Sequence, residues 1–534
     1  MIAKSAKARG VARRALLAAG GALLAAPAFS QAQARVLRFV PQADLGGLDP
    51  IAISSNVIRN HGYMVWDTLY GVDYAFRPHP QMAAGHLVED DGRSVTITLR
   101  DGLRFHDGEA VRAEDCVVSL RRWMRRSPMG QVLAARIEDL AALDDKRFRF
   151  RLKSRFPLLI DALAVPSNPQ PFIMPARLAA TDAFQQIREP IGSGPFRFVM
   201  DEFRQGSRAV WARNPDYVPS AGGGSGLTAG PKVVHFDRVE WTIIPDAGTA
   251  AAALTAGEVD WLEQMPAEIQ MLLGRDRRLL LEPIDPLPLP GQFRFNHRQP
   301  PFDNPAIRRA FLPAISQEDF MTAIVGPDPA KYVKDMGFFT PGSPFASDEG
   351  LEPLKGPRSI ERAKQALKAA GYKGELVRLI GTTDIVSTTA QAQVAADLLR
   401  RLEINADVVL TDWGTVAQRR MNRGPLDQGG WSIACFATSG MDFINPVTHL
   451  QLRSDGANAA PGWPDLPEVE ARRAAWLEAP DIATQQAIAR QIQAAAMEGL
   501  PYIPTGAYYS ITAHRRTLVD RVKGFAIFWG IRRS

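Results

Sequence analysis

Residues 94–124 read SVTITLRDGLRFHDGEAVRAEDCVVSLRRWM, and this one stretch contains two kinds of periodicity. Within 94–100, apolar and polar residues alternate, which is the pattern of a strand with one buried face. After the Asp-Gly turn signal at 107–108, residues 114–124 carry apolar side chains at helical spacing. A strand followed so closely by a helix indicates a mixed α/β fold.

The same two periods recur along the rest of the chain. Strands are expected at 36–40, 147–152, 236–244 and 406–410. Helices with recognisable capping residues are expected at 249–256, 305–314, 317–325, 360–370 and 391–402, followed by a late helical stretch at 468–497. The alternation of helix and strand places the whole chain in the α/β class.

The positive charge of the chain is concentrated in its first residues. The 534-residue sequence has a formal net charge of +6, with 46% hydrophobic and 22% charged residues. Residues 1–34 contribute five of these charges and contain no acid, so the remaining chain is nearly neutral. A nearly neutral body has no basic footprint for a phosphate backbone, which excludes nucleic acid as an expected partner. The ordinary composition also excludes disorder, collagen and a disulfide-rich scaffold.

The first residues have the layout of a secretory signal. A basic start is followed by the apolar run 15–29 and by Ala-Gln-Ala at 32–34, the small-residue pattern that signal peptidase accepts. That run is short for spanning a bilayer of about 30 Å. We therefore expect a cleaved signal, a mature chain from about Arg35, and a soluble protein in an exported compartment. Arg13-Arg14 leaves both the Sec and the Tat route open, and no cysteine follows the cleavage site to carry a lipid.

Motifs of catalysis are absent from the sequence. It contains no HExxH, GxSxG, P-loop or CxxC motif, and its eight histidines are scattered singly. His106-Asp107 lies in a turn between a strand and a helix, where Asp-Gly has a backbone role. The glycine-rich segment 221–226 follows no strand and has no lysine, which favours a surface loop over a phosphate site. We expect no enzyme activity, no cofactor and no metal.

Two cysteines, Cys116 and Cys435, lie far apart in a chain that we expect to be exported. Export makes a disulfide chemically feasible, but sequence spacing cannot place the two Cα atoms within about 7 Å of each other. The favoured interpretation is two buried thiols that act as small hydrophobic residues.

Six groups of short motifs follow one another along the chain. They are LRDGLRFHDG at 99–108 with AED at 113–115, IGSGPF at 191–196 with RNPDY at 213–217, ALTAGEVD at 253–260, FN at 295–296 with PFD at 301–303, AAGY at 369–372, and PYIP at 501–504. Together they resemble the family 5 solute-binding proteins of ABC importers, the large periplasmic receptors that include dipeptide-, oligopeptide- and nickel-binding members. The resemblance extends over about 36–530.

The resemblance implies an α/β, two-lobed, hinged receptor, a flytrap of the large cluster C type with an extra subdomain in lobe one. The implied parts are 35–77, 190–287 and 499–534 for lobe one, 78–189 for its inserted subdomain, and 288–498 for lobe two. Hinge strands are then expected near 283–294 and 499–505. The first of these contains four prolines at 283–290, and a stiff, extended passage suits a crossing between domains.

The resemblance further implies a binding component that closes two lobes over a ligand in a cleft. We expect a monomer that binds di- to oligopeptides and delivers them to an ABC permease and ATPase complex in the inner membrane. The alternatives within binding are another amine-bearing or chelated solute, such as an opine or a metal-metallophore complex. An exported hydrolase or a chaperone using the same cleft are the alternatives from other classes.

The segment GMDFINP at 440–446 resembles the family's acidic-aromatic loop, in which the acid binds the ligand amine. Asp442 matches that acid and Phe443 the aromatic residue. Asn445 stands where many members have a second acid, which argues against a dicationic ligand. The competing interpretation is that Asp442 caps the turn before Pro446.

Further cleft residues are expected on both sides. Trp431 and Phe436 precede the loop at 440–446, and Trp413 approaches it, although a core position is the favoured interpretation for Trp413. On the facing lobe, Asn56 and Arg59 follow the family's Leu-Asp-Pro turn. The planar guanidinium of Arg59 is suited to a ligand carboxylate.

Overall fold

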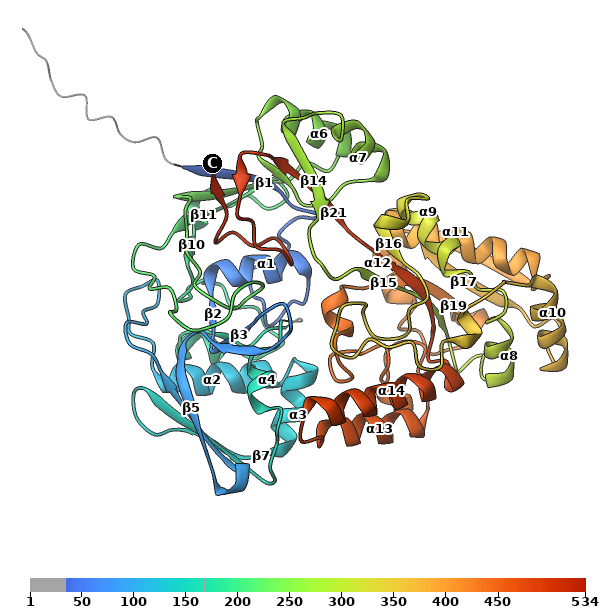
Figure 1. Cartoon of the computed structure of the whole chain (residues 1–534), viewed down its shortest axis with the longest axis horizontal. Helices are drawn as coiled ribbons and strands as arrows, with labels where there is room; N and C mark the ends of the chain where they lie inside the picture. The colour runs from blue at the N-terminus through green and yellow to red at the C-terminus, as the bar shows by residue number, and fades with distance from the viewer. Residues whose placement is uncertain (1–34, 167–168) are drawn as a thin grey trace, which may run out of the picture.

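The computed structural model describes residues 35–166 and 169–534, so the expected signal segment at 1–34 lies outside the described residues. Figure 1 shows two halves side by side, the left one blue to green and the right one mainly yellow to red. We call the half built on a seven-stranded sheet lobe one and the half built on a six-stranded sheet lobe two. The chain contains both helices and strands throughout, as the two periodicities predict.

Lobe one is centred on a mixed sheet with the strand order β10-β11-β12-β1-β13-β21-β14. The strands are β1 (Val36–Val40), β10 (Phe196–Phe198), β11 (Arg208–Arg213), β12 (Arg238–Thr242), β13 (Trp261–Leu262), β14 (Leu279–Pro283) and β21 (Ile511–Arg515), with the helices α1 (Asn56–Val65), α6 (Ala247–Ala256) and α7 (Ala267–Leu273). Strand β1 pairs in parallel with both β12 and β13. Helix α6 ends at Gly257, which has a φ of 88°, a left-handed conformation that glycine adopts at little cost.

A smaller antiparallel sheet, in the order β5-β6-β8-β7, extends lobe one. Its elements are β5 (Ala83–Glu89), β6 (Ser94–Leu99), β7 (Ile137–Ala142) and β8 (Arg147–Leu152), with α2 (Ala113–Met124), α3 (Pro128–Arg136), α4 (Leu159–Leu163) and α5 (Ala176–Ala179). Short ladders join β2 (Asp67–Thr68) to β9 (Phe172–Ile173), β3 (Tyr70–Val72) to β4 (Pro78–Pro80), and β22 (Leu518–Val519) to β23 (Arg532–Arg533). Strand β6 and helix α2 confirm the two elements expected within 94–124.

Lobe two is centred on the strand order β16-β20-β15-β19-β17-β18. Its elements are β15 (Leu289–Phe295), β16 (Tyr332–Val333), β17 (Val377–Thr382), β18 (Ala406–Thr411), β19 (Ile433–Ala437) and β20 (Ile503–Tyr508), with α8 (Pro305–Ala310), α9 (Gln317–Val325), α10 (Ile360–Ala369), α11 (Val386–Arg401), α12 (Trp413–Arg419), α13 (Pro467–Leu477) and α14 (Ile482–Gly499). The late helical stretch is two helices, because Asp481 caps α14 by accepting from Thr484 N at 2.8 Å.

The chain crosses between the two sheets twice. Strand β14 belongs to lobe one and β15 to lobe two, so the first crossing is 284–288, within the expected proline-rich passage. Strand β20 pairs with β15 in lobe two, and β21 pairs with β14 in lobe one. We propose the second crossing at 509–510, later than the expected 499–505, because β20 is needed to fill the sheet of lobe two.

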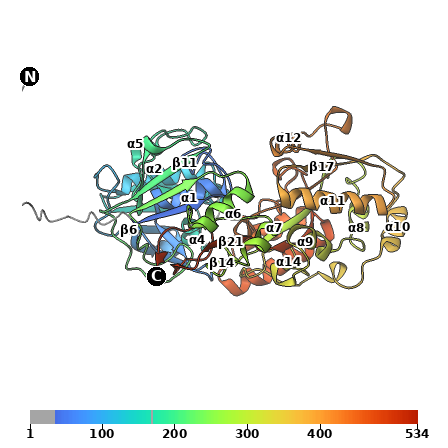
Figure 2. The ribbon, with the colours of Figure 1, turned by 90° about the horizontal axis from the view of Figure 1, so that it is seen from above.

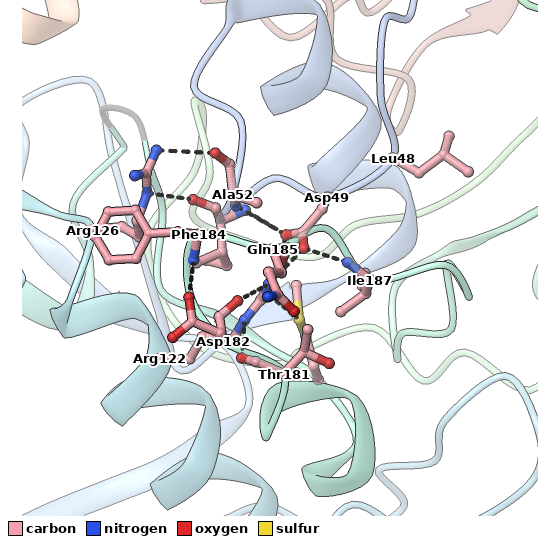
Figure 3. A network of polar contacts seen from close by, with 12 residues as sticks. Leu48, Asp49, Ala52, Arg122, Arg126, Thr181, Asp182, Phe184, Gln185 and Ile187 are labelled. Carbon is pink, nitrogen blue, oxygen red and sulfur yellow. Dashed lines mark hydrogen bonds and ion pairs between the residues drawn. The ribbon is translucent and has the colours of Figure 1, made fainter.

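One buried ion pair ties the start of lobe one to its extension (Figure 3). Asp49 Oδ2 lies 2.7 Å from Arg122 Nη2, and both side chains are almost completely buried. The Asp49 carboxylate also accepts hydrogen bonds from the backbone N–H groups of Ile51, Ala52 and Ile187. Arg122 donates its remaining N–H groups to backbone carbonyls of 181–185. The pair therefore joins the turn after Asp49, helix α2 and the distant loop that contains 181–187. It also satisfies backbone hydrogen-bonding groups in the turn and in the loop.

Cys116 on α2 and Cys435 on β19 are both free and fully buried, so the interpretation as two buried thiols is confirmed.

Each ring nitrogen of His106 faces backbone, with Nε2 3.1 Å from Gly194 O and Nδ1 accepting from Gly192 N. Burial lowers the pKa of His106 to about 4, which matches a neutral ring that bridges two loops. Within 35–166 and 169–534, no helix is long and apolar enough to cross a membrane.

Candidate functional site

A cluster of charged side chains gathers where the two lobes meet. Arg59 comes from α1 of lobe one and Asp442 from the loop that follows β19 of lobe two. Asp285 comes from the first crossing and Glu263 from the end of β13. Burial lowers the pKa of Arg59, and the charges of all three carboxylates oppose that effect, although none of the three forms an ion pair with the guanidinium.

Arg59 is 5% exposed and lies against an aromatic ring. Its guanidinium carbon is 4.4 Å from the ring centroid of Phe525, close enough for a cation–π interaction. The only hydrogen bonds of the guanidinium to described residues are long ones, of 3.4 Å, to Asn60 Oδ1. Helix α1 holds Arg59 in this place because Ser55 caps its first turn, accepting from Ile58 N at 3.2 Å.

The Asp442 carboxylate has no hydrogen-bond donor among the described residues. Its backbone N–H donates to Ser439 O at 3.0 Å, inside the 3₁₀ turn Gly440–Phe443. Burial raises the pKa of Asp442 to about 6, and the charge of Arg59 opposes that rise. The result is a carboxylate held between the lobes with an electrostatic neighbour but without a direct partner.

Asn445, and not Asp442, caps the turn before Pro446. Asn445 Oδ1 accepts from Val447 N at 2.9 Å and from Thr448 N at 3.0 Å. The competing interpretation of Asp442 as the turn cap is therefore wrong, because a neighbouring amide already performs that role. The same contacts engage the side-chain oxygen of Asn445 in the turn, and its predicted place in the ligand site stays a prediction.

The loop that carries Asp442 is fixed against the first crossing. Thr340 Oγ1 donates to Gly440 O at 2.7 Å, and Thr340 N donates to Phe443 O at 3.2 Å. A Cβ at Gly440 would come within 2.4 Å of Pro288 O, so only glycine permits this close approach. The position of Asp442 is thereby coupled to the segment that joins the lobes.

A cavity of about 240 Å³ opens beside this loop. It is lined by residues of lobe one, of the first crossing and of lobe two, among them Tyr74, Phe76, Leu227, Asp285, Leu287 and Met441. Asp285 Oδ1 accepts from Leu287 N at 2.9 Å, and burial raises the pKa of Asp285 to about 7. The cavity is thus mostly apolar, with one acid, Asp285, and one base, Lys523, in its wall.

The other sequence-predicted residues occupy different environments. Asn56 is half-buried at the start of α1. Phe443 is 1% exposed and stacks on His449 at 3.6 Å between ring centroids. Trp431 is fully buried in lobe two and donates from Nε1 to Arg420 O at 3.0 Å. Phe443 and Trp431 are therefore core side chains in this structure.

Phe436 and Trp413 lie together, 5.9 Å apart between ring centroids and nearly perpendicular. Phe436 is mostly buried, whereas Trp413 is half-buried and thus more accessible than the favoured core position implies. The difference arises because α12 starts at Trp413, at the rim of its cluster.

Sequence reasoning brings Arg59 and Asp442 to the site but misses Asp285, Glu263 and Phe525. The sequence does contain a signal that could have identified Asp285, since it is the only charged residue within 283–290. Phe525 had none, because it lies near the end of the chain and reaches Arg59 only through the tertiary fold. Arg59 forms no ion pair with a described residue, so its role toward a ligand carboxylate stays a prediction.

Comparisons with known proteins agree with this architecture. The model of the family "Bacterial extracellular solute-binding proteins, family 5 Middle" matches residues 77–452. The probable peptide ABC transporter periplasmic-binding protein y4tO of Sinorhizobium fredii is 34% identical over 98% of this chain and 100% of its own. The periplasmic binding protein DppA of Helicobacter pylori, solved with the peptide STSA, superposes with a TM-score of 0.77 at 22% identity, covering 93% of this chain and 98% of its own. AgaA of A. tumefacien R10, solved with agropinic acid, has a TM-score of 0.75 at 20% identity, covering 93% and 99%.

Proposed function

The chain belongs to family 5 of the bacterial extracellular solute-binding proteins, and from this we propose that it is the periplasmic binding component of an ABC importer for peptides. The proposal includes a monomeric receptor that delivers its ligand to a permease and ATPase complex in the inner membrane. Its 34% identical relative carries the name of a peptide transporter component, which supports peptides over other solutes. AgaA was solved with agropinic acid, so an opine is the principal alternative ligand.

The observation that carries the proposal is the unpartnered Asp442 carboxylate between the lobes. Asp442 is half-buried, and its carboxylate accepts no hydrogen bond and forms no ion pair with a described residue, so it has no direct counter-charge for the state in which the lobes close over it. A ligand ammonium placed at Asp442 supplies the missing partner. The neighbouring cavity of about 240 Å³ then receives an apolar side chain of the ligand.

Binding and transport are linked through the two crossings. The ligand contacts Asp442 on lobe two and the cavity wall on lobe one, so it stabilises the closed arrangement of the lobes. The loop that carries Asp442 contacts the first crossing through Gly440. Closure of the lobes over the ligand therefore affects the first crossing, 284–288, directly.

The identity of the ligand is tested by native mass spectrometry of freshly purified protein, followed by a thermal-shift screen. The screen contains di-, tri- and tetrapeptides, agropinic acid and nickel-histidine. A true ligand raises the unfolding midpoint by mass action, and we expect peptides to do so. A midpoint raised by agropinic acid or nickel-histidine and by no peptide would refute the peptide proposal.

Ligand binding is expected to reduce the radius of gyration in small-angle X-ray scattering. Rotation of two lobes about 284–288 and 509–510 brings them together with little change inside each lobe. The measurement compares ligand-free protein, prepared by partial unfolding and dialysis, with protein saturated by the best ligand of the screen. An unchanged radius would contradict the hinged closure.

Affinity for amine-bearing ligands is expected to fall about tenfold between pH 7.5 and pH 5. The pKa of Asp442 is about 6 without ligand, so most molecules lose this charge at pH 5 and the ammonium loses its partner. Calorimetric titration at several pH values measures the change. Asp285 and Glu263 face the same Arg59, so they must be controlled for. The variant Asp285→Asn should retain the pH dependence and Asp442→Asn should abolish it, and the reverse pattern would exclude Asp442 as the titrating group.

Export is the remaining part of the proposal. The expected signal at 1–34 lies outside the described residues. Intact-mass measurement of periplasmic material should give a chain that starts near Arg35 and carries no lipid. A retained or acylated N-terminus would be inconsistent with the expected processing.

A further inference from the structure

An ion pair joins a side chain of lobe one to a side chain of lobe two. Arg136 is the last residue of α3 in lobe one, and Glu478 directly follows α13 in lobe two. Arg136 Nη2 lies 2.5 Å from Glu478 Oε1. Within residues 35–166 and 169–534 this is the one ion pair between the lobes, because each of the others connects two residues of the same lobe.

The pair lies at the edge of the molecule away from the two crossings. Figure 1 shows α3 beside one end of the α13–α14 pair at the lower centre, whereas β14 and β21 lie at the upper centre. On the side of the crossings, Lys331 Nζ donates to Gln270 Oε1 at 3.2 Å, and Figure 2 shows α7, which carries Gln270, beside α9 of lobe two. A rotation about 284–288 and 509–510 moves the far edge most, so opening the lobes separates Arg136 from Glu478.

The guanidinium of Arg136 is held in place by its own lobe. Its Nη1 donates to Val132 O at 3.3 Å, and its guanidinium carbon lies 5.0 Å from the ring centroid of Phe156, close enough for a cation–π interaction. The side chain is 21% exposed. Because the guanidinium is already ordered, pairing across the lobes costs little additional side-chain entropy.

Glu478 has no cationic partner in its own lobe among the described residues. It is the C-cap residue of α13, where the negative end of the helix dipole disfavours a carboxylate. Asp481, the N-cap residue of α14, adds a second carboxylate three residues later in the chain. Arg136 supplies the positive charge that this turn lacks, and it does so only while the lobes are in contact.

We propose that Arg136 and Glu478 form a latch that favours the closed arrangement of the lobes and slows the release of ligand. The inference goes beyond the proposed function but rests on the hinged closure that is part of it. The Glu478 side chain is 54% exposed, so dissolved salt screens the pair and weakens it. The latch therefore makes the equilibrium between open and closed lobes depend on ionic strength.

The test measures the separation of the lobes in the ligand-free mature chain, so it needs no identified ligand. Spin labels are attached at Ser154→Cys in lobe one and at Ala471→Cys in lobe two, both exposed positions. The native Cys116 and Cys435 are fully buried, and we expect them not to react. Double electron–electron resonance then gives the distribution of distances between the labels, and from it the ratio of closed to open molecules.

Glu478→Gln and Arg136→Gln should each lower the ratio of closed to open molecules about 2- to 5-fold at low salt. Wild type should lose the same factor when the NaCl concentration is raised from about 20 mM to about 500 mM, whereas the two variants should hardly respond. Combining Arg136→Glu with Glu478→Arg should restore part of the salt-sensitive closed population.

An ion pair on α13 provides the matched control. Glu468 Oε1 lies 2.5 Å from Arg472 Nη2, and the two side chains are 68% and 33% exposed, but both belong to lobe two. Glu468→Gln removes a charge from the same helix and should leave the ratio of closed to open molecules unchanged. Unfolding curves of every variant check that the fold is intact.

The latch and the peptide proposal fail in different experiments. Distance distributions that are the same in wild type, Glu478→Gln and Arg136→Gln refute the latch, and so does an equally large shift in Glu468→Gln. Neither result affects the peptide proposal, which the ligand screen decides. A screen that refutes peptides leaves the latch standing, because the distance measurement uses no ligand.

Discussion

Asp442→Ala is expected to weaken the binding of ligands with a free amino group by about 100- to 1000-fold. The closed cleft excludes water, and an ammonium enclosed without a counter-charge costs on the order of 3–5 kcal/mol, while about 1.4 kcal/mol corresponds to a tenfold change in affinity. Arg59, whose charge acts on Asp442, has the wrong sign to replace the lost carboxylate. Isothermal titration with the best peptide of the screen measures the loss.

The structure offers a matched control within the same turn. Asn445→Ala removes the turn cap and should cost about 1 kcal/mol of stability while leaving affinity nearly unchanged. Asp442→Ala should show the opposite pattern, because its carboxylate accepts no hydrogen bond from a described residue. N-acetylated peptides should bind wild type weakly and lose little more in Asp442→Ala. An Asp442→Ala protein that binds free-amine peptides as tightly as wild type would show that the ammonium binds elsewhere.

Asp49→Ala is expected to lower the free energy of unfolding by about 3–5 kcal/mol. The substitution leaves the Arg122 guanidinium, which is 2% exposed, without its counter-charge in the interior. It also removes the acceptor of three backbone N–H groups, those of Ile51, Ala52 and Ile187. Urea denaturation followed by circular dichroism measures the change (the contacts are drawn in Figure 3).

An exposed ion pair serves as the control for this prediction. Asp397→Ala breaks the contact of Asp397 with Arg400 on the surface of α11 and should change stability by less than about 1 kcal/mol. Adding Arg122→Met to Asp49→Ala should restore part of the lost stability, because the buried charge is then gone. A loss of less than about 1 kcal/mol in Asp49→Ala alone would mean that water reaches Arg122.

Most of the helices and strands could be predicted from local periodicity and from capping residues. Strand β6 and helix α2 are where alternation and helical spacing place them, and Gly257 ends α6. These features depend on neighbours in the chain, and so a single sequence contains them. The late helical stretch was predicted as one element although it is two helices, α13 and α14, because a cap inside a run of helix-forming residues does not change the average pattern.

The sheet that each strand joins could not be predicted from such local patterns. The segments 503–508 and 511–515 are both strands, yet 503–508 joins the sheet of lobe two and 511–515 that of lobe one. The choice is made by pairing with strands that lie hundreds of residues away, since β20 pairs with β15 and β21 with β14. No local property of either segment carries that information.

The sequence by itself determined the α/β class, the family resemblance and Asp442 as the residue to examine, because these depend on short motifs and local spacing. Only the tertiary structure decided what surrounds Asp442. It showed that Asn445 holds the turn, that the Asp442 carboxylate has no direct partner among the described residues, and that Arg59 lies against the ring of Phe525. The physical reason is that charge pairing and burial act through space, between side chains from both lobes, and are absent from the order of residues along the chain.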